Sequence, residues 1–421
     1  MKKTANRVFI SALTAATIFT TACIPVPAAE EAPIILENGK DRSKEENIQA
    51  EIRMENAAKI TDEIASGADF PNVMFSPTSL NYALGMLAEG AGGKTKEALN
   101  SFLGTDQYGK YAKEYTKSAA ERNSSEEEEK NGYRQKLKIA NALWADYNWK
   151  LKEDYIERVQ TDFNAGLTNE DFGDPGKVSK MINNWADEQT EHLIPEIVTP
   201  DMISEEAGLV LTNSLYFESP WSEEAWVMSE KKENFKGFDG IEETTYMMTE
   251  GNRYFENEQA TAFSRYYQNG LQFVGILPKK EGDFKLTDLD LYSLLNSEPE
   301  YTQVICKMPA LDFTTSTLLE DILSKMGLAD IFSDSADFSG LSETPAKVGS
   351  IIQKTNLQLD ENGTKAAAVT AIVMEKCALM PEEPEIIKEV TLDRPFAFLI
   401  YDEENQEVLF MGKTATTEKQ A

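Results

Sequence analysis

The spacing of apolar residues along the chain predicts that helices dominate its first half. Apolar side chains recur at helical intervals over residues 43–66 and again over 76–89, where Ser79 is positioned to cap the second helix. Shorter helical patterns follow at 95–103 and 178–194. Each of these segments has an apolar face that can pack against a core.

The rest of the chain contains short apolar runs that are typical of strands. Residues 137–144 and 273–277 have strand-like composition, and 208–217 is almost continuously apolar, as expected for a strand buried on both faces. Two further apolar runs, 396–401 and 408–411, flank the polar sequence DEENQE and predict a hairpin. Since helices come early and strands late, we expect an α+β fold.

The composition is that of a large globular protein with an acidic surface. Of the 421 residues, 41% are hydrophobic and 27% are charged, so the chain can bury a sizeable core. The formal net charge of −31 disfavours binding to nucleic acids or to anionic lipids, because both need clustered Lys and Arg. The acidic run SSEEEEK at 124–130 is expected to be a solvated loop without a direct function.

The N-terminus has the features of an export signal, with basic residues followed by a short apolar run. We expect residues 1–22 to be removed and residues 23–42 to form a polar tether, with Cys23 as the lipidated first residue of a lipoprotein. The alternative is cleavage after the small pair Val26 and Ala28, which would release a soluble protein. In both cases we expect an exported protein, extracellular or on the cell surface, with a lipid anchor as its only attachment to a membrane.

Several kinds of catalytic and metal-binding chemistry lack the residues that they need. Two cysteines besides the lipidation candidate, Cys306 and Cys377, form neither a disulfide framework nor a zinc-site spacing. The one histidine, His192, lies at a polar helix end and is expected at the surface. The Gly-Lys-Thr triplets at Gly93 and Gly412 lack the preceding glycine of a phosphate-binding loop. We therefore expect no enzyme activity, no cofactor and no metal.

Several segments, taken in chain order, resemble the serpin family. NVMFSPTSLNYALGMLAEGAGGKTKEAL at 72–99 matches its F-S-P-x-S segment, helix and Gly-rich turn, and LVLTNSLYFESPW at 209–221 matches its L-x-N-x-x-Y-F-x-x-x-W strand. Further matches follow in family order: INNWADEQTEHLIPEIV at 182–198, YMMTEG at 246–251, PALDF at 309–313, MGLADIFSDSADFSGLS at 326–342 and LDRPFAFLI…VLFMGK at 392–413. The ordered set covers residues 45–415.

The resemblance implies a serpin-like single domain over residues 43–421, with a large central sheet, smaller sheets, about nine helices and an exposed reactive loop at about 361–392. It also implies inhibition of serine proteases by a suicide-substrate mechanism. The protease attacks the loop and forms a covalent acyl-enzyme, and the cut loop then inserts into the large sheet. The inhibitor is expected to be a monomer that supplies no catalytic residue. The alternative is a non-inhibitory serpin that acts as a binding or structural surface lipoprotein.

The family's hinge, where the reactive loop leaves the sheet, has an acidic residue, then Gly-Thr and a run of alanines. The matching residues are Glu361, Gly363, Thr364, Ala366, Ala367 and Ala368. A segment that slides between existing strands needs small or β-branched side chains and cannot contain proline. Residues 363–380 contain no proline, and most side chains of residues 363–373 are small or β-branched. The fifteen residues 363–377 would extend about 50 Å, enough to carry a protease across the molecule.

Family spacing places the residue before the cut fourteen positions after the hinge glycine. That residue is Cys377, and Ala378 follows the cut. A small and modestly apolar cysteine suits an elastase-like specificity pocket. Two neighbours stay open as alternatives, because Lys376 would suit a trypsin-like pocket and Met380 a chymotrypsin-like or subtilisin-like one.

Other family positions lie where strands of the large sheet part to admit the loop. Ser76, Ser79 and Asn213 match the polar cluster called the shutter, and Trp221 matches the tryptophan near the place where the loop enters. The family usually has histidine in the shutter, and this chain has Gln353 at the corresponding position. Glutamine can still donate and accept hydrogen bonds, but it cannot titrate.

Overall fold

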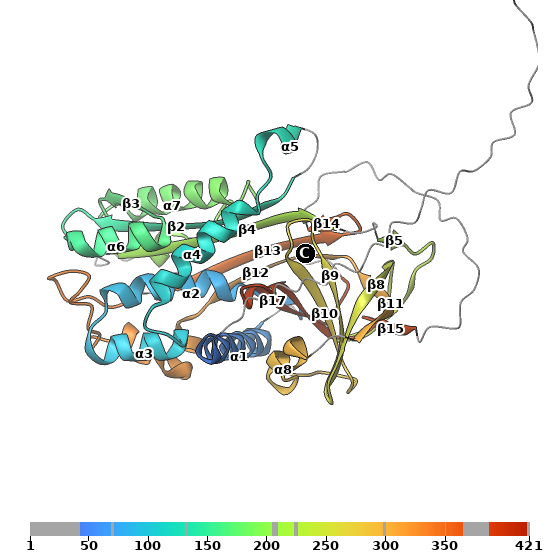
Figure 1. The fold of residues 1–421 in the computed structure, drawn as a ribbon. Coiled ribbons are helices and arrows are strands. Elements are labelled where there is room, and N and C mark those ends of the chain that lie inside the picture. The colour runs from blue at the N-terminus through green and yellow to red at the C-terminus, as the bar shows by residue number, and fades with distance from the viewer. Residues whose placement is uncertain are drawn as a thin grey trace, which may run out of the picture. The chain divides into compact units, whose positions relative to one another are not determined.

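The computed structural model describes residues 43–68, 71–130, 134–203, 209–222, 226–297, 300–349, 351–364 and 387–418. Within these residues the chain forms nine α-helices and three β-sheets, so the expected α+β fold class is confirmed (Figure 1). None of the described helices is both long enough and apolar enough to span a bilayer.

The helices lie mainly in the first half of the chain. They are α1 (Lys44–Gly67), α2 (Pro77–Gly90), α3 (Gly93–Leu103), α4 (Tyr108–Glu121), α5 (Glu126–Lys130), α6 (Glu153–Phe163), α7 (Pro175–Gln189), α8 (Leu291–Asn296) and α9 (Glu320–Leu323).

Two large sheets hold most of the strands. The six-stranded sheet has the order β12 (Leu311–Leu318), β13 (Ile352–Asp360), β14 (Gly363–Thr364), β4 (Leu209–Pro220), β2 (Lys136–Asp146) and β3 (Ala165–Glu170). The nine-stranded sheet has the order β1 (Val73–Phe75), β17 (Glu407–Thr414), β16 (Phe396–Asp402), β10 (Gln272–Pro278), β9 (Ala260–Tyr266), β8 (Tyr246–Glu256), β11 (Glu300–Pro309) and β15 (Lys388–Thr391), with β5 (Val227–Met228) beside β8. A separate hairpin joins β6 (Glu233–Gly237) to β7 (Gly240–Thr244).

Helices cover both faces of the six-stranded sheet. α2 contacts β4 on one face and β17 of the other large sheet, so it fills the space between the two sheets. α7 packs on the opposite face, where Trp144, Val178 and Ile182 belong to a small separate core (Figure 1). Because β4 is covered on both sides, its sequence is apolar at consecutive positions rather than at alternate ones.

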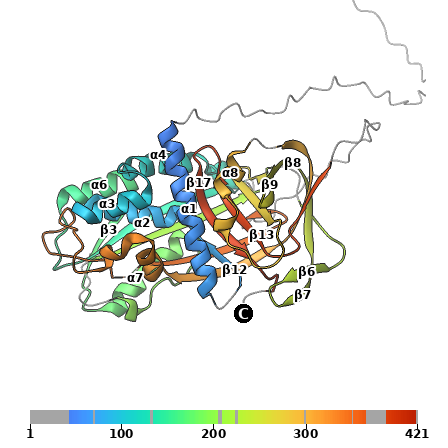
Figure 2. The same cartoon turned by 90° about the horizontal axis from the view of Figure 1, so that it is seen from below.

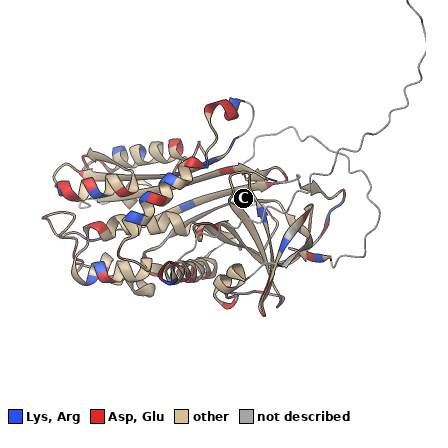
Figure 3. Cartoon of the chain, viewed as in Figure 1, with Lys and Arg blue, Asp and Glu red and all other residues tan. Residues whose placement is uncertain are grey.

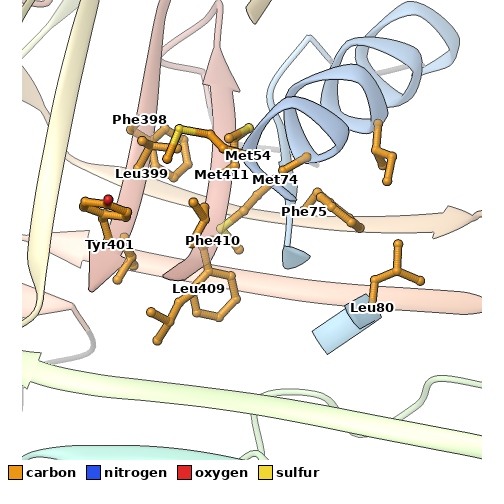
Figure 4. Close-up of a cluster of buried hydrophobic side chains, with 14 of the residues drawn as sticks. Met54, Met74, Phe75, Leu80, Phe398, Leu399, Tyr401, Leu409, Phe410 and Met411 are labelled. Atoms are coloured by element: carbon orange, nitrogen blue, oxygen red, sulfur yellow. The ribbon is translucent and has the colours of Figure 1, made fainter. Parts of the chain in front are cut away.

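The main core lies where the N-terminal helices meet the C-terminal hairpin. α1 lies along β17 and β1 (Figure 2). Figure 4 shows Met54 of α1, Phe75 of β1 and Leu80 of α2 converging on Leu409 and Met411 of β17, and all five are buried. The hairpin expected from the last two apolar runs is therefore present as β16 and β17, and it anchors the core.

Two helix boundaries differ from those expected from the sequence. The cap of α2 is Ser76 and not Ser79, because Pro77 takes the first helical position and the Ser76 hydroxyl accepts the Ser79 N–H at 3.2 Å. The helix expected at 178–194 is α7, which ends at Gln189 because the backbone turns left-handed soon afterwards, with φ of 50° at Glu191 and 65° at His192.

Other local expectations also need correction. The acidic run at 124–130 contains a helix, α5, because Ser125 and Glu128 cap its first turn reciprocally. All its residues are exposed as expected, and Figure 3 shows that α5 is mostly acidic whereas α4 and α6 carry both signs of charge. Ile48, one of the apolar residues in the helical pattern at 43–66, is 46% exposed, so it does not pack against the core as that pattern predicts.

Candidate functional site

The hinge segment forms a short strand inside the six-stranded sheet. After β13 the chain turns at residues 361–362 and returns as β14. β14 pairs antiparallel with β13 through Leu359↔Thr364 and with β4 through Thr364↔Ser219. In the described part of the chain, no backbone pairing joins β4 directly to β13. The two strands therefore run side by side in the same direction, separated by β14 at one end only.

Gly363 is the residue that this turn requires. Its φ is +147°, a conformation that side-chain-bearing residues rarely adopt. A Cβ at this position would lie 2.4 Å from the Ser219 carbonyl oxygen and 2.7 Å from the Pro220 Cα. Only glycine lets the chain approach β4 so closely at the start of β14.

Thr364 is held inside the sheet by a hydrogen bond to Tyr267. The two hydroxyl groups lie 2.7 Å apart, and Thr364 is 4% exposed. Burial raises the pKa of Tyr267 far above that of a free phenol, although the bond to Thr364 opposes the shift. The phenol is therefore neutral at physiological pH and can serve as either donor or acceptor to the threonine.

Aromatic side chains support this end of the site. The Tyr267 ring stacks on Trp221, with centroids 4.4 Å apart and planes at 12°. The Trp221 indole N–H donates to the Asp360 carbonyl at 3.1 Å, and its backbone N–H donates to the Asn362 carbonyl at 3.2 Å. Trp226 adds a third bond, from its backbone N–H to the Glu361 carbonyl at 3.3 Å. These contacts fix the turn that leads into β14.

A second polar cluster lies near the other ends of β4 and β13. Gln353 on β13 forms two hydrogen bonds to the backbone of Ser76, accepting from its N–H at 2.7 Å and donating to its carbonyl at 2.9 Å. The Ser76 hydroxyl donates to the Leu409 carbonyl at 2.8 Å. Gln353 therefore ties β13 to the cap of α2, and both hydrogen-bonding groups of its side-chain amide are used.

Asn213 faces Gln353 from β4 but bonds away from it. Its amide NH₂ donates to the Asn141 side-chain carbonyl at 2.6 Å, and Asn141 in turn donates to the Phe163 carbonyl at 2.7 Å. Among the described residues, none hydrogen-bonds to the buried Oδ1 of Asn213. In the gap between β4 and β13, Asn213 and Gln353 are thus each bonded to neighbours on their own side. No described hydrogen bond joins the two residues.

The structure places the expected site residues in two groups. Glu361, Gly363, Thr364 and Trp221 meet at the β14 end of the gap, while Ser76, Ser79, Asn213 and Gln353 surround its opposite end. Of the expected reactive loop, residues 363–364 form β14 and residues 388–391 form β15. The remaining expected residues lie outside the described part of the chain: Cys23, Ala366, Ala367, Ala368, Lys376, Cys377, Ala378 and Met380.

The sequence did not reveal the residues whose hydrogen bonds hold these two groups of site residues in place. Tyr267, Asn141 and Trp226 lie far along the chain from the residues that they bond, and no local motif marks them. His192 is 74% exposed and pairs with Asp187, as expected for a surface residue. The described residues contain no group of three or more His, Cys, Asp or Glu arranged to hold a metal.

Comparison with known proteins identifies the family to which this chain belongs. The family model described as serpin (serine protease inhibitor) matches residues 53–416. The chain belongs to the serpin family. A serpin-like protein of Methanosarcina acetivorans, itself uncharacterized, is 33% identical over 361 residues, which is 82% of each chain.

Two further comparisons agree with this assignment. Leukocyte elastase inhibitor A of Mus musculus is 29% identical over 363 residues, covering 82% of this serpin and 93% of the mouse protein. The crystal structure of tengpin, a thermophilic serpin in the native state, superposes with a TM-score of 0.75 at 26% identity, covering 90% of this chain and 95% of tengpin. Serpins are in general protease inhibitors rather than enzymes, which agrees with the weak case for catalysis here.

Proposed function

We propose that this serpin inhibits a serine protease by presenting a bond near residue 377 as bait and then inserting the cut segment between β13 and β4. The observation that carries the proposal is the position of β14. Its two residues already lie between those strands, and beyond them the described residues show no pairing between β4 and β13. A strand that continues from Thr364 would find unpaired backbone groups on both sides.

The proposed chemistry belongs to the protease, and this chain supplies the substrate. The protease serine Oγ attacks the carbonyl carbon of Cys377, and an ester bond forms as the Cys377–Ala378 peptide bond breaks. The amine of Ala378 takes a proton from the protease histidine and leaves with the C-terminal fragment. Insertion then displaces the attached protease before water can hydrolyse the ester, and the pulled active site loses its alignment.

We propose an elastase-like enzyme as the target, since Cys377 is small and modestly apolar. The similarity to leukocyte elastase inhibitor A of the mouse is consistent with this choice. Lys376 and Met380 remain the alternatives, for a trypsin-like and for a chymotrypsin-like or subtilisin-like target respectively.

Incubation of the purified chain with one protease of each type tests the proposal. We expect a covalent complex that survives SDS electrophoresis, together with a released peptide that begins at Ala378 by mass spectrometry. A peptide beginning at Cys377 would move the bait to Lys376, and one beginning at Pro381 would move it to Met380. Cleavage by every protease without any stable complex would refute inhibition and favour the non-inhibitory alternative, a binding or structural lipoprotein.

We also propose that the protein is exported and lipidated at Cys23, which rests on the N-terminal signal pattern alone. Expression in a bacterial host with a labelled fatty acid tests this, with Cys23→Ala as the control. Label in the parent and none in the variant is expected. An unlabelled parent whose mature N-terminus follows Ala28 would support the soluble alternative.

A further inference from the structure

The chain that leaves α7 crosses the gap between β4 and β13 on the face of the sheet that α7 covers. Near the start of this crossing, Glu191 forms an ion pair with Lys136 of β2. Further along, the Glu196 carbonyl accepts a hydrogen bond from Lys354 of β13 at 3.0 Å. Because β4 and the gap lie between β2 and β13 in the order of the sheet, residues 190–196 span the gap. We call these residues the strap.

Side chains of the strap close the gap from this face. Thr190, Leu193 and Ile194 line a small void that Ile400 and Phe410 line from the opposite face. Six residues of the two strands line the same void: Leu215, Tyr216, Phe217, Thr355, Asn356 and Leu357. The void measures only about 20 Å³, little more than the room that one water molecule needs. A further strand at this level of the gap would need space that the strap now fills.

The start of the strap has an unusual backbone conformation. φ is 50° at Glu191 and 65° at His192, and a positive φ is unfavourable for residues that carry a side chain. Two contacts with Asp187 hold His192 in place, from its backbone N–H to the Asp187 carbonyl at 2.8 Å and between its ring Nδ1 and the carboxylate at 2.6 Å. Such a turn persists only where its surroundings impose it, so loss of polar contacts at the turn should release the strap.

Glu191 joins the strap to the sheet through a network of charges. Its carboxylate accepts hydrogen bonds from Lys136 and, at 3.2 Å, from Arg134. Arg134 also pairs at 3.0 Å with Glu218 of β4, which is buried and accepts a hydrogen bond from the Tyr216 hydroxyl at 2.7 Å. The bond from Lys136 is the main cause that lowers the pKa of Glu191, so this carboxylate is charged at neutral pH.

Dissolved ions can reach this network. The side chains of Glu191, Lys136 and Arg134 are 29%, 25% and 37% exposed. Salt screens charges at such depth, whereas sodium chloride does not weaken apolar contacts such as those of Leu193 and Ile194 in this way. The ionic and the apolar contributions to the closed strap can therefore be separated by salt.

We propose that Glu191 is a salt-sensitive latch that holds the strap closed over the gap between β4 and β13. Opening of the strap frees the space of Thr190, Leu193 and Ile194, so the latch sets how readily the gap admits another strand. The latch depends only on contacts between the strap and the sheet. Its effect on protease trapping rests on the proposed function, because only an inserting segment needs the gap to open.

Amide hydrogen exchange in the full chain tests the latch without any protease. Glu191→Gln removes the charge and keeps the size of the side chain. The matched control is Glu63→Gln, which makes the same change of charge in an ion pair between α1 and Lys325. Mass spectrometry follows residues 194–198, where three backbone N–H groups bond to Thr190 and Asn183.

We expect exchange at 194–198 to be about three to five times faster in Glu191→Gln, because loss of a partly exposed ion pair shifts an opening equilibrium by about that factor. Glu63→Gln should exchange like the parent. Raising sodium chloride from about 0.05 to about 0.5 M should speed exchange in the parent and not in Glu191→Gln. Equal exchange in the parent and Glu191→Gln at low salt would overturn the latch.

A second variant approaches the latch from β2. Lys136→Gln should speed exchange at 194–198 as Glu191→Gln does, and the double variant should exchange no faster than the faster single variant. Fully additive effects of the two changes would show that they act separately and would overturn the assignment of Glu191 as the latch on Lys136.

The rate at which the SDS-stable complex forms at saturating protease tests the consequence for trapping. It should be about three to five times faster for Glu191→Gln than for the parent, by the same shift in opening. If no protease is trapped but exchange responds as expected, inhibition is refuted and the latch stands. If protease is trapped but Glu191→Gln matches the parent in exchange and in rate, inhibition stands and the latch is refuted.

Discussion

The hydrogen bond between Thr364 and Tyr267 offers a direct test of whether the hinge already lies in the sheet before the loop is cut. Tyr267→Phe removes one hydroxyl and leaves that of Thr364 without this partner at 4% exposure. Thr364→Val removes the other hydroxyl with little change of shape. Each single change is expected to destabilise the protein by about 1–2 kcal/mol, because a buried hydroxyl loses its partner.

The double variant gives the coupling free energy between the two hydroxyl groups. Replacing both hydroxyl groups leaves no unpaired polar group, so its cost should be well below that of the two single changes added together. We expect a coupling free energy of about 1 kcal/mol between the two sites. Urea unfolding of the parent, both single variants and the double variant measures it, provided that the slopes of the four curves agree.

The same cycle is then repeated on protein whose loop has been cut. Because β14 is paired with both neighbours already, the coupling should be equal in intact and cut protein. A coupling that is absent from the intact protein and present only after cutting would contradict the structure, since Thr364 would then enter the sheet only on insertion. A coupling near zero in both forms would show that the hydroxyl contact has no energetic role.

Three further predictions concern the hinge, the shutter and the bait. Gly363→Ala should destabilise the intact protein by about 2–4 kcal/mol in urea unfolding, because its Cβ would meet the Ser219 carbonyl and its φ is positive; an unchanged stability would contradict this turn. Since Gln353 cannot titrate, Gln353→His should add a pH dependence near about pH 6.5 to the insertion rate, followed by fluorescence, that the parent lacks. Cys377→Arg should shift the SDS-stable complex from elastase-like to trypsin-like enzymes, and an unchanged preference would place the bait at another bond.

The elements that could be predicted from sequence are those whose determinants are local. The β16–β17 hairpin follows from two apolar runs on either side of a polar turn. α1 follows from helical spacing, and its start at Lys44 follows from Ser43, which forms a reciprocal cap with Glu46. The error at α2 is also local in origin, because both Ser76 and Ser79 can cap a helix and only the position of Pro77 distinguishes them.

The organisation of the site depends on contacts between distant parts of the chain, which explains why only the family resemblance pointed to it. Thr364 and Tyr267 are separated by 97 positions, and Asn213 and Asn141 by 72. No periodicity in the sequence reports such a pair. The replacement of the family's histidine by Gln353 could be seen in the sequence, but its consequence could not. Only the structure shows that both amide groups of Gln353 bond to Ser76, and that no described residue hydrogen-bonds to Asn213 Oδ1.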